Sequence, residues 1–303
     1  MLFRSFNRFI QYYTKTAREV QEKPGLTPAL IEDMRKEQRL FVEYVIKEGH
    51  GTLDELFNPG YTFLNQPLAE HYGITGVTGT NMVKVAVDAT RGGLLHQGVT
   101  QVATSDYQAT SLVKRGIMVR EQLFCKEFGA PVEADPTEPH FPDRAITTRE
   151  RWDLVNGEHA SNGNCWKCHQ YMNDTGGSME NYDASGRYRQ QENAYNYAAF
   201  PQVLPIYAGG PFIDNTGSHK LADIHNVRDI AALVPHNPDA QRCMADSYLR
   251  FTFGSPAQAH TAGIINALSK GLAETGSLRD MMRTVATSHA FLYKQSPDAR
   301  KQP

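Results

Sequence analysis

The sequence predicts a mainly α protein built from consecutive helical modules, with a loop-rich middle segment and minor β-structure. Apolar residues recur at helical spacing in both terminal thirds. Capping pairs such as Thr27-Pro28 and Asn237-Pro238 stand before those stretches, and only one short stretch alternates as a strand does. Because a chain of 303 residues usually divides into more than one domain, we expect modules at 1–78, 79–192 and 193–303.

The first module is expected to consist mainly of helices. Thr27 and Pro28 fit the N-cap and first position of a helix that ends near Gly49, and Thr52 fits the cap of a short helix that follows. Before them, aromatic residues are spaced so that they share one helical face. These residues are Phe3, Phe6, Phe9, Tyr12 and Tyr13.

The second module is expected to combine a short strand with two helices. Residues 82–87 alternate and are rich in β-branched side chains, as in a strand. Residues 111–128 have a strong helical pattern that places Cys125 in the last turn, and residues 148–155 form a second, shorter helix. Between these helices, four prolines within 130–145 predict an extended linker.

The third module is expected to begin irregularly and then become helical. A hairpin is predicted around 208–211, where Gly and Pro cluster. Asn237-Pro238 predicts a helix that ends at Gly254, Ser255-Pro256 predicts another, and Ser277 with Asp280 predicts a capped helix that runs to Phe291.

The main chemical signal is the run Cys165-Trp166-Lys167-Cys168-His169. Two cysteines separated by two residues and followed at once by a histidine form the attachment pattern of a c-type haem. Cys165 and Cys168 would bind the two vinyl groups as thioethers, and His169 would be the proximal ligand of the iron. The sequence therefore predicts one covalent haem c.

Three other interpretations of this motif compete with haem attachment. A zinc site usually needs a second pair of Cys or His ligands, and no second Cys-x-x-Cys is present. A thioredoxin-like dithiol is expected after a buried strand, whereas the residues at 157–164 are polar and rich in Gly and Asn. A chance match is the third alternative. The residues after His169 contain glycines and aromatics that suit a loop around a flat cofactor.

Composition argues against two classes of partner. Lys and Arg number 31 against 33 Asp and Glu, so there is no basic excess of the kind that nucleic acid binding requires. No stretch approaches the ~20 apolar residues of a membrane span. We therefore expect no nucleic acid partner and no membrane span.

The expected cellular location follows from the haem. Covalent haem attachment takes place outside the bacterial cytoplasmic membrane, yet the first ten residues do not have the pattern of a signal peptide. We therefore expect a periplasmic or cell-surface protein from which a leader has been removed, or a chain that is part of a longer protein. In such a location, Cys125 and Cys243 are a candidate disulfide, the alternative being two separately buried thiols.

The segment around the motif resembles the haem-binding segment of planctomycete-type cytochrome proteins, in which a His precedes Cys-x-x-Cys-His and Met, Glu-Asn-Phe-Asp and Gly-Arg-x-Arg follow. The matching residues here are His159, Cys165, Cys168, His169, Met172, Gly176, Glu180, Asn181, Asp183, Gly186, Arg187 and Arg189. Flanking runs resemble that family too: 63–73, 91–95 and 114–116, and then Cys243, 250–254 and 288–291. The resemblance implies a c-type haem protein that corresponds to the family's three C-terminal modules.

The chain departs from the family pattern in places. Asn173-Asp174 replaces Asp-Pro, which frees a backbone N–H that proline would lack, and Tyr182 replaces Phe. His289 stands where the family has an acidic residue. None of these positions is a haem attachment residue.

Candidate iron and haem contacts beyond the motif are less specific. His159 and His71 are the candidates for the distal ligand, because each lies in a motif of its own, with an ordinary core or surface histidine as the alternative. His96 and Met179 are weaker candidates. Arg187 and Arg189 could bind the haem propionates, or could be a solvated basic pair.

The predicted function is electron transfer in the periplasm or at the cell surface, within a larger assembly of redox partners or subunits. Two strong axial ligands would make the iron an electron carrier, whereas an open distal position would permit peroxidase-like chemistry. An electron carrier is favoured over an enzyme. The third hypothesis is a structural subunit that is braced by its haem.

Overall fold

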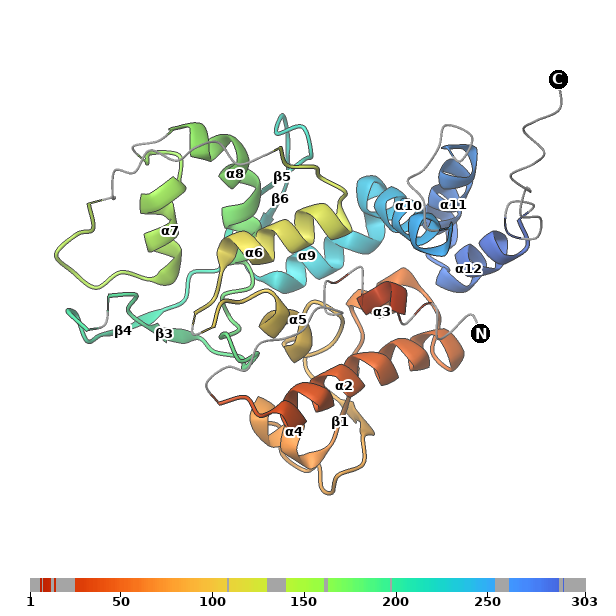
Figure 1. The fold of residues 1–303 in the computed structure, drawn as a ribbon, viewed down its shortest axis with the longest axis horizontal. Coiled ribbons are helices and arrows are strands. Elements are labelled where there is room, and N and C mark those ends of the chain that lie inside the picture. The colour runs from red at the N-terminus through yellow and green to blue at the C-terminus, as the bar shows by residue number, and fades with distance from the viewer. Residues whose placement is uncertain are drawn as a thin grey trace, which may run out of the picture.

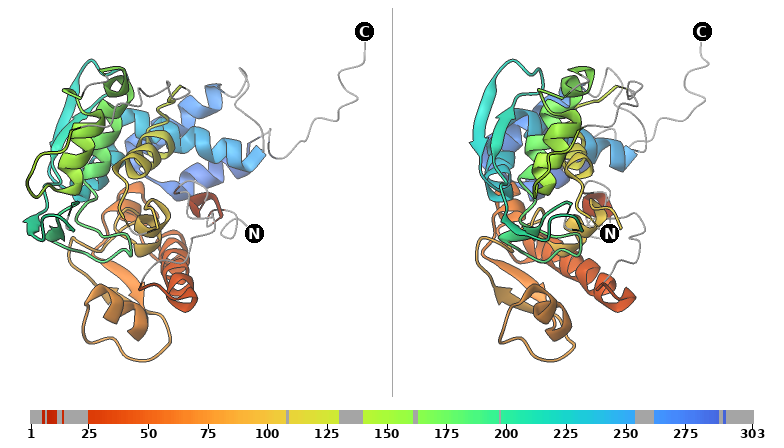
Figure 2. Two further views of the ribbon diagram at one scale, coloured as in Figure 1. Left: turned by 60° about the vertical axis from the view of Figure 1, so that its left-hand side comes forward. Right: turned by 90° about the vertical axis from the view of Figure 1, so that its left-hand side faces the viewer.

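The chain is about half helical, with three small antiparallel sheets of two strands each (Figures 1 and 2). A computed structural model describes residues 6, 8–11, 14, 25–107, 109–129, 140–160, 163–196, 198–253, 262–288 and 291. In Figure 1, α2 and α4 lie at the bottom, α7 and α8 at the upper left, and α10–α12 at the upper right. The expected mainly α architecture is confirmed at this level.

The N-terminal elements follow the predicted caps. Thr27 Oγ1 accepts a hydrogen bond from Leu30 N at the start of α2, and Thr52 Oγ1 accepts one from Glu55 N at the start of α3. The strand predicted at 82–87 is β2, which pairs with β1 so that Tyr61 faces Ala86. The elements are α2 (Pro28–Lys47), α3 (Leu53–Phe57), β1 (Tyr61–Leu64), α4 (Gln66–Tyr72), β2 (Val83–Ala86) and α5 (Gly98–Ala103).

The helix predicted at 111–128 is shorter than expected. It consists of α6 (Leu112–Ile117) and a π-helical turn η1 (Met118–Leu123), and the Lys126 amide then donates to Arg120 O. Cys125 has a φ of 50°, the left-handed conformation that usually closes a helix at glycine. The prediction that Cys125 lies in the last helical turn is therefore wrong, because η1 ends at Leu123, before Cys125.

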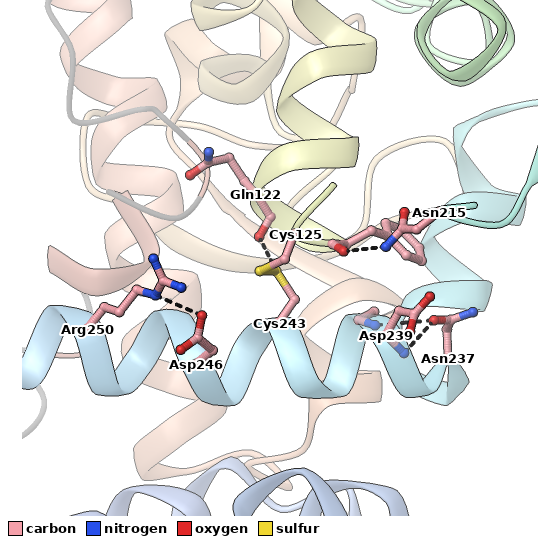
Figure 3. The surroundings of a disulfide bond; sticks show 10 residues. Gln122, Cys125, Asn215, Asn237, Asp239, Cys243, Asp246 and Arg250 are labelled. Atoms are coloured by element: carbon pink, nitrogen blue, oxygen red, sulfur yellow. Dashed lines mark hydrogen bonds and ion pairs between the residues drawn. A yellow bond between two sulfur atoms is a disulfide. The ribbon is translucent and has the colours of Figure 1, made fainter. Parts of the chain in front are cut away.

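The left-handed conformation brings Cys125 to α10, where it forms a disulfide with Cys243 (Figure 3). The two Cα atoms are 5.3 Å apart, within the normal range for a disulfide, and the residues are 118 apart in sequence. The predicted bond is thus confirmed. It fixes the end of η1 to the C-terminal helices.

The region before α9 contains two hairpins, not the single one expected. Strands β3 (Gln191–Asn193) and β4 (Val203–Pro205) form one, and β5 (Gly210–Ile213) and β6 (Lys220–Ile224) form the other. Residues 210 and 211, placed in a predicted turn, begin β5 instead. The turn follows it, where Asp214 Oδ1 accepts hydrogen bonds from the amides of Thr216 and Ser218.

The C-terminal helices also follow their caps. Asn237 Oδ1 accepts from Ala240 N at the start of α10, and Ser277 Oγ accepts from Asp280 N at the start of α12. The elements are α9 (Val227–Leu233), η2 (Val234–His236), α10 (Pro238–Phe253), α11 (Ala262–Thr275) and α12 (Leu278–Ala286). Helix α12 ends at Ala286, earlier than the predicted Phe291.

Some predictions fall outside the described residues. These are the positions Phe3, Tyr12 and Tyr13, most of the proline-rich linker, the Ser255-Pro256 cap, and the family matches at Gly254 and His289.

One large apolar core draws residues from all three predicted modules. It includes Phe41 of α2, Met118 of η1, Phe212 of β5, Met244 of α10 and Met282 of α12, each at most 4% exposed. A smaller cluster lies between α2, α4 and α5. The module boundaries at 1–78, 79–192 and 193–303 stay predictions. Hydrophobic residues from all three ranges pack together in this one core.

A buried carboxyl group lies between α2, β1 and α4. Glu37 accepts hydrogen bonds from Thr62 Oγ1 at 2.6 Å and from the Tyr72 hydroxyl at 2.7 Å, and it is fully buried. Burial raises the pKa of Glu37 from 4.5 to about 7, against the opposing effect of its hydrogen bonds and of Arg91. At neutral pH this group is therefore partly protonated in the folded chain.

We expect Glu37→Gln to remove part of the pH dependence of stability. Because the folded pKa exceeds the unfolded value, the folded state binds more protons, and stability falls as pH rises from about 4.5 to about 7. This contribution is ~3 kcal/mol across the window. Urea unfolding of both proteins between pH 4.5 and 8 measures it, and parallel pH profiles would contradict the assignment.

Candidate functional site

The Cys-x-x-Cys-His motif lies in the first half of α8 (Gly163–Gly177), which runs beside α7 (Thr148–Asn156) in Figure 1. Cys165 and Cys168 are both free thiols and half-buried. Residues three and four apart on a helix share a face, so Cys165 lies on the same side as Cys168 and His169. The helix alone therefore sets the relative placement of the three side chains.

Both nitrogens of His169 have partners from asparagine side chains. Nδ1 is 3.1 Å from Asn173 Oδ1, one helical turn further along α8, and Nε2 is 3.4 Å from Asn156 Nδ2 at the end of α7. Asn173 Nδ2 in turn donates to Asn156 Oδ1 at 2.9 Å. Since an amide oxygen accepts, His169 carries its proton on Nδ1 and its lone pair on Nε2.

This arrangement suits a histidine that binds a metal. A ligand histidine commonly donates its other ring N–H to a carbonyl or carboxylate oxygen, which fixes the ring and its tautomer. Asn173 supplies that acceptor here, at a position where the chain departs from the family pattern. Burial also lowers the pKa of His169, which keeps the ring neutral, as a metal ligand must be.

The residues at the start of α8 fit a c-type haem in their donor chemistry. Two free thiols and a neutral imidazole with its lone pair on Nε2 are the groups that attachment requires. One contact would have to change, because Asn156 Nδ2 faces the Nε2 atom that would bind iron. Asn156 is buried and its Oδ1 also accepts from Asn173 Nδ2, so freeing Nε2 would require this contact to be rearranged as well.

Helix α8 continues through residues that the sequence assigned to a loop. Gly116 of α6 and Gly176 of α8 lie where the two helices cross, and a Cβ at either position would collide with the backbone of Met172 or Leu112. The prediction of a loop directly after His169 is therefore wrong for residues 170–177. Close packing on α6 keeps this segment helical despite its glycines.

Helix α8 is also anchored to its other neighbours. Arg149 of α7 forms an ion pair with Asp174, and its Nη1 donates to Gly209 O at 3.1 Å before β5. Asp174 is the second residue at which the chain departs from the family pattern. The departures at 173 and 174 thus make specific contacts with the motif histidine and with α7.

A buried ion pair holds the chain beyond the end of α8. Arg115 Nη1 lies 2.8 Å from Glu180 Oε1, and both side chains are at most 1% exposed. Arg115 also donates to the carbonyl oxygens of Met179 and Tyr182, while Thr110 Oγ1 donates to the second Glu180 oxygen. The family-like runs around Arg115 and Glu180 therefore form a structural clamp.

The two arginines proposed for the propionates have protein partners. Arg189 Nη2 is 3.2 Å from Glu180 Oε2 and 3.7 Å from Glu192 Oε2. The Arg187 guanidinium is exposed, and its Nε donates to His71 Nδ1 at 3.3 Å. Their role at a haem stays a prediction, and neither is brought to the Cys-x-x-Cys-His end of α8 by these contacts.

The two distal candidates are placed differently. His71 ends α4, with Nε2 2.8 Å from Ser185 O and Nδ1 bonded to Arg187, so both ring nitrogens are occupied. Figures 1 and 2 show α4 and α8 at opposite ends of the molecule. His159 is exposed in the turn after α7, three residues beyond Asn156. His159 therefore lies close to the motif in sequence, whereas His71 is held by partners at 185 and 187.

The two weaker candidates for the distal ligand, His96 and Met179, are core residues. His96 is 2% exposed and packs edge-on against Tyr182, and burial lowers its pKa to about 3. Met179 is fully buried in the main core.

Sequence reasoning missed Asn156 and Asn173 as partners of His169. Only the spacing of Asn173, four residues after His169, could have indicated its role.

The described residues lack two features, a cluster of metal-ligating side chains and a membrane-spanning helix. No three or more His, Cys, Asp or Glu side chains in that part of the chain gather closely enough to hold a metal ion. No helix there combines the length and the apolar character needed to cross a bilayer.

Comparisons with known proteins give two matches. Residues 3–74 match the family model PSD4, a protein of unknown function (DUF1592), and residues 91–192 match PSCyt3, a protein of unknown function (DUF1588). No curated protein and no solved structure matches the chain. Both families are planctomycete cytochrome-related domains without a characterised activity. In these two stretches the chain is therefore similar to planctomycete cytochrome-related domains.

Proposed function

We propose that this chain is a monohaem c-type electron carrier of the periplasm or cell surface, which works with redox partners in a larger assembly. The observation that carries the proposal is the geometry of His169, whose Nδ1 is held by Asn173 and which lies one helical turn after Cys165 on the same face of α8. A c-type haem bound there would supply one-electron redox chemistry at its iron.

Each residue of the site has a separate role in this proposal. Cys165 and Cys168 would attach a haem through their Sγ atoms, and His169 would hold its iron through Nε2. Asn173 accepts the Nδ1 proton of His169 and so fixes the ring. Asn156 would have to give up its contact with Nε2. His159 is the distal ligand that we favour, because both nitrogens of His71 already have protein partners.

The disulfide supports the proposed location. Disulfides persist in oxidising compartments such as the periplasm and the cell surface, which are also the compartments in which haem c is attached. The Cys125–Cys243 bond therefore agrees with export.

The first test is whether exported protein carries covalent haem. We expect a c-type pyridine haemochrome spectrum and an intact mass increased by one haem, both lost in Cys165→Ser/Cys168→Ser. The matched control is Cys125→Ser/Cys243→Ser, which removes two cysteines elsewhere and should keep the haem. Absence of haem from correctly exported protein would contradict the proposal and leave a zinc site or a dithiol to be tested.

The distal ligand separates an electron carrier from a haem enzyme. If His159 binds the iron, the spectrum is low-spin and cyanide binds poorly, and His159→Ala converts the iron to a high-spin form that binds cyanide. A parent protein that is already high-spin would favour the peroxidase-like alternative. A haem that cannot be reduced reversibly would favour the structural one.

A further inference from the structure

A cavity of about 320 Å³ lies away from the Cys-x-x-Cys-His motif, beside the end of α4 and the end of β2. Its volume is at the lower end of the range for small-molecule sites. The residues that line it and matter here are Tyr72, Ile74, Val87, Asp88, Arg91 and Tyr188.

Arg91 is a buried cation in the wall of this cavity. It is 3% exposed, and its Nη1 donates to the carbonyl oxygens of His96 and Gly186 at 3.1 and 3.0 Å. Its guanidinium lies over the Tyr72 ring at 3.9 Å from the centroid. Its Nη2 is buried and has no hydrogen-bond partner among the residues that the structure describes.

The charge of Arg91 is felt by two carboxyl groups, Asp88 and Glu37, but neither of them forms a hydrogen bond or ion pair with its guanidinium among the described residues. Within the described ranges its hydrogen-bond acceptors are two neutral carbonyl groups. Glu37 is a buried carboxyl group that interacts electrostatically with Arg91. However, Glu37 accepts its hydrogen bond from the Tyr72 hydroxyl and not from the Arg91 guanidinium. A buried cation without an ion pair is unfavourable, and an incoming carboxylate would supply the missing charge and acceptor.

The remaining walls limit what kind of anion fits. Tyr72, Tyr188, Ile74 and Val87 offer rings and aliphatic surface, so the body of the ligand should be apolar or flat. Asp88 lies at the exposed rim, where its carboxylate is held by the amide and hydroxyl of Thr90. A second negative charge on the ligand would face Asp88, and the described residues that line the cavity include no second cation to offset it.

We propose that this cavity binds a small monocarboxylate with a ring or short aliphatic body, whose carboxylate pairs with Arg91. The site is independent of the haem, because its residues come from α4, β2 and the 88–91 and 186–188 segments. The Arg91 side chain lines the cavity and carries the unpartnered Nη2, and its buried setting strengthens a charge-assisted hydrogen bond.

The test is calorimetric titration of the full-length protein with benzoate, with benzamide as the neutral analogue. We expect saturable benzoate binding and at least roughly tenfold weaker benzamide binding, since the charge-assisted bond is lost. Inorganic phosphate should not compete. No saturable benzoate binding, equal binding of benzamide, or competition by phosphate would each overturn the assignment.

Substituting Arg91 would also remove its hydrogen bonds to two backbone carbonyls. The electrostatic part of the proposal is therefore tested with Asp88→Asn, which can keep the hydrogen bonds to Thr90. Removing the rim charge should tighten benzoate binding about threefold at low salt and less at high salt. The control is Glu274→Gln on α11, which removes one exposed negative charge elsewhere and should change nothing. An unchanged affinity in Asp88→Asn would refute the location, as would a benzoate-induced shift of the haem spectrum, which would mean binding at the iron.

Discussion

Loss of the Cys125–Cys243 disulfide is expected to lower the free energy of unfolding by about 4 to 5 kcal/mol in the chain-entropy description. The bond joins residues 118 apart, so the unfolded chain without it gains the conformational freedom of a long loop. In the folded chain it connects the end of η1 to α10, whose other contacts with η1 and the core remain. The folded structure should therefore persist in the reduced protein, but with less stability.

Denaturant unfolding of exported parent and Cys125→Ser/Cys243→Ser measures this loss. A thiol reductant provides the control, because it should bring the parent to the stability of the double variant and leave the variant unchanged. Cys125 is exposed, so a reductant can reach the bond. A double variant within 1 kcal/mol of the parent would show that the loop closure does not act on the unfolded state as described.

The helix starts could be predicted because their causes are local. Thr27, Thr52 and Ser277 each accept a hydrogen bond from a backbone amide three residues ahead, as their positions in the sequence indicated. The cysteine count likewise indicated the disulfide, since only one pair remains outside the motif. These features need no knowledge of the rest of the fold.

The helix ends could not be predicted in the same way, because tertiary contacts decide them. Gly176 would end an isolated helix, but against Leu112 it permits the close crossing that extends α8. Conversely, the periodic pattern at 111–128 favours a long helix, yet the chain leaves it at Leu123 to reach Cys243.

In the candidate site, too, local features could be predicted from the sequence and tertiary contacts could not. The motif at 165–169 is local and can be recognised from the sequence alone, whereas the contact between His169 and Asn156 joins two helices. Arg189 illustrates the limit of motif reasoning. Its position beside the motif in the family pattern suggested a propionate, but the fold pairs it with Glu180.

Arg115→Met is expected to be the most damaging single substitution near the site, with a loss of about 3 to 5 kcal/mol. The Arg115–Glu180 pair is almost completely buried, so removing the cation leaves a carboxylate with little access to water. It also removes the donors to the carbonyls of Met179 and Tyr182, which fix the turn after α8. Burial lowers the pKa of Arg115, and the Glu180 carboxylate opposes that effect.

The matched control is Arg189→Met, because Arg189 contacts the same carboxylate but its side chain is 24% exposed. That variant should lose only about 1 kcal/mol or less, as expected for a partly solvated pair. Adding Glu180→Leu to Arg115→Met should restore part of the loss, since the stranded charge is then gone. Denaturant unfolding of the four proteins decides the matter. Equal losses in the two arginine variants would mean that burial does not govern the strength of this clamp.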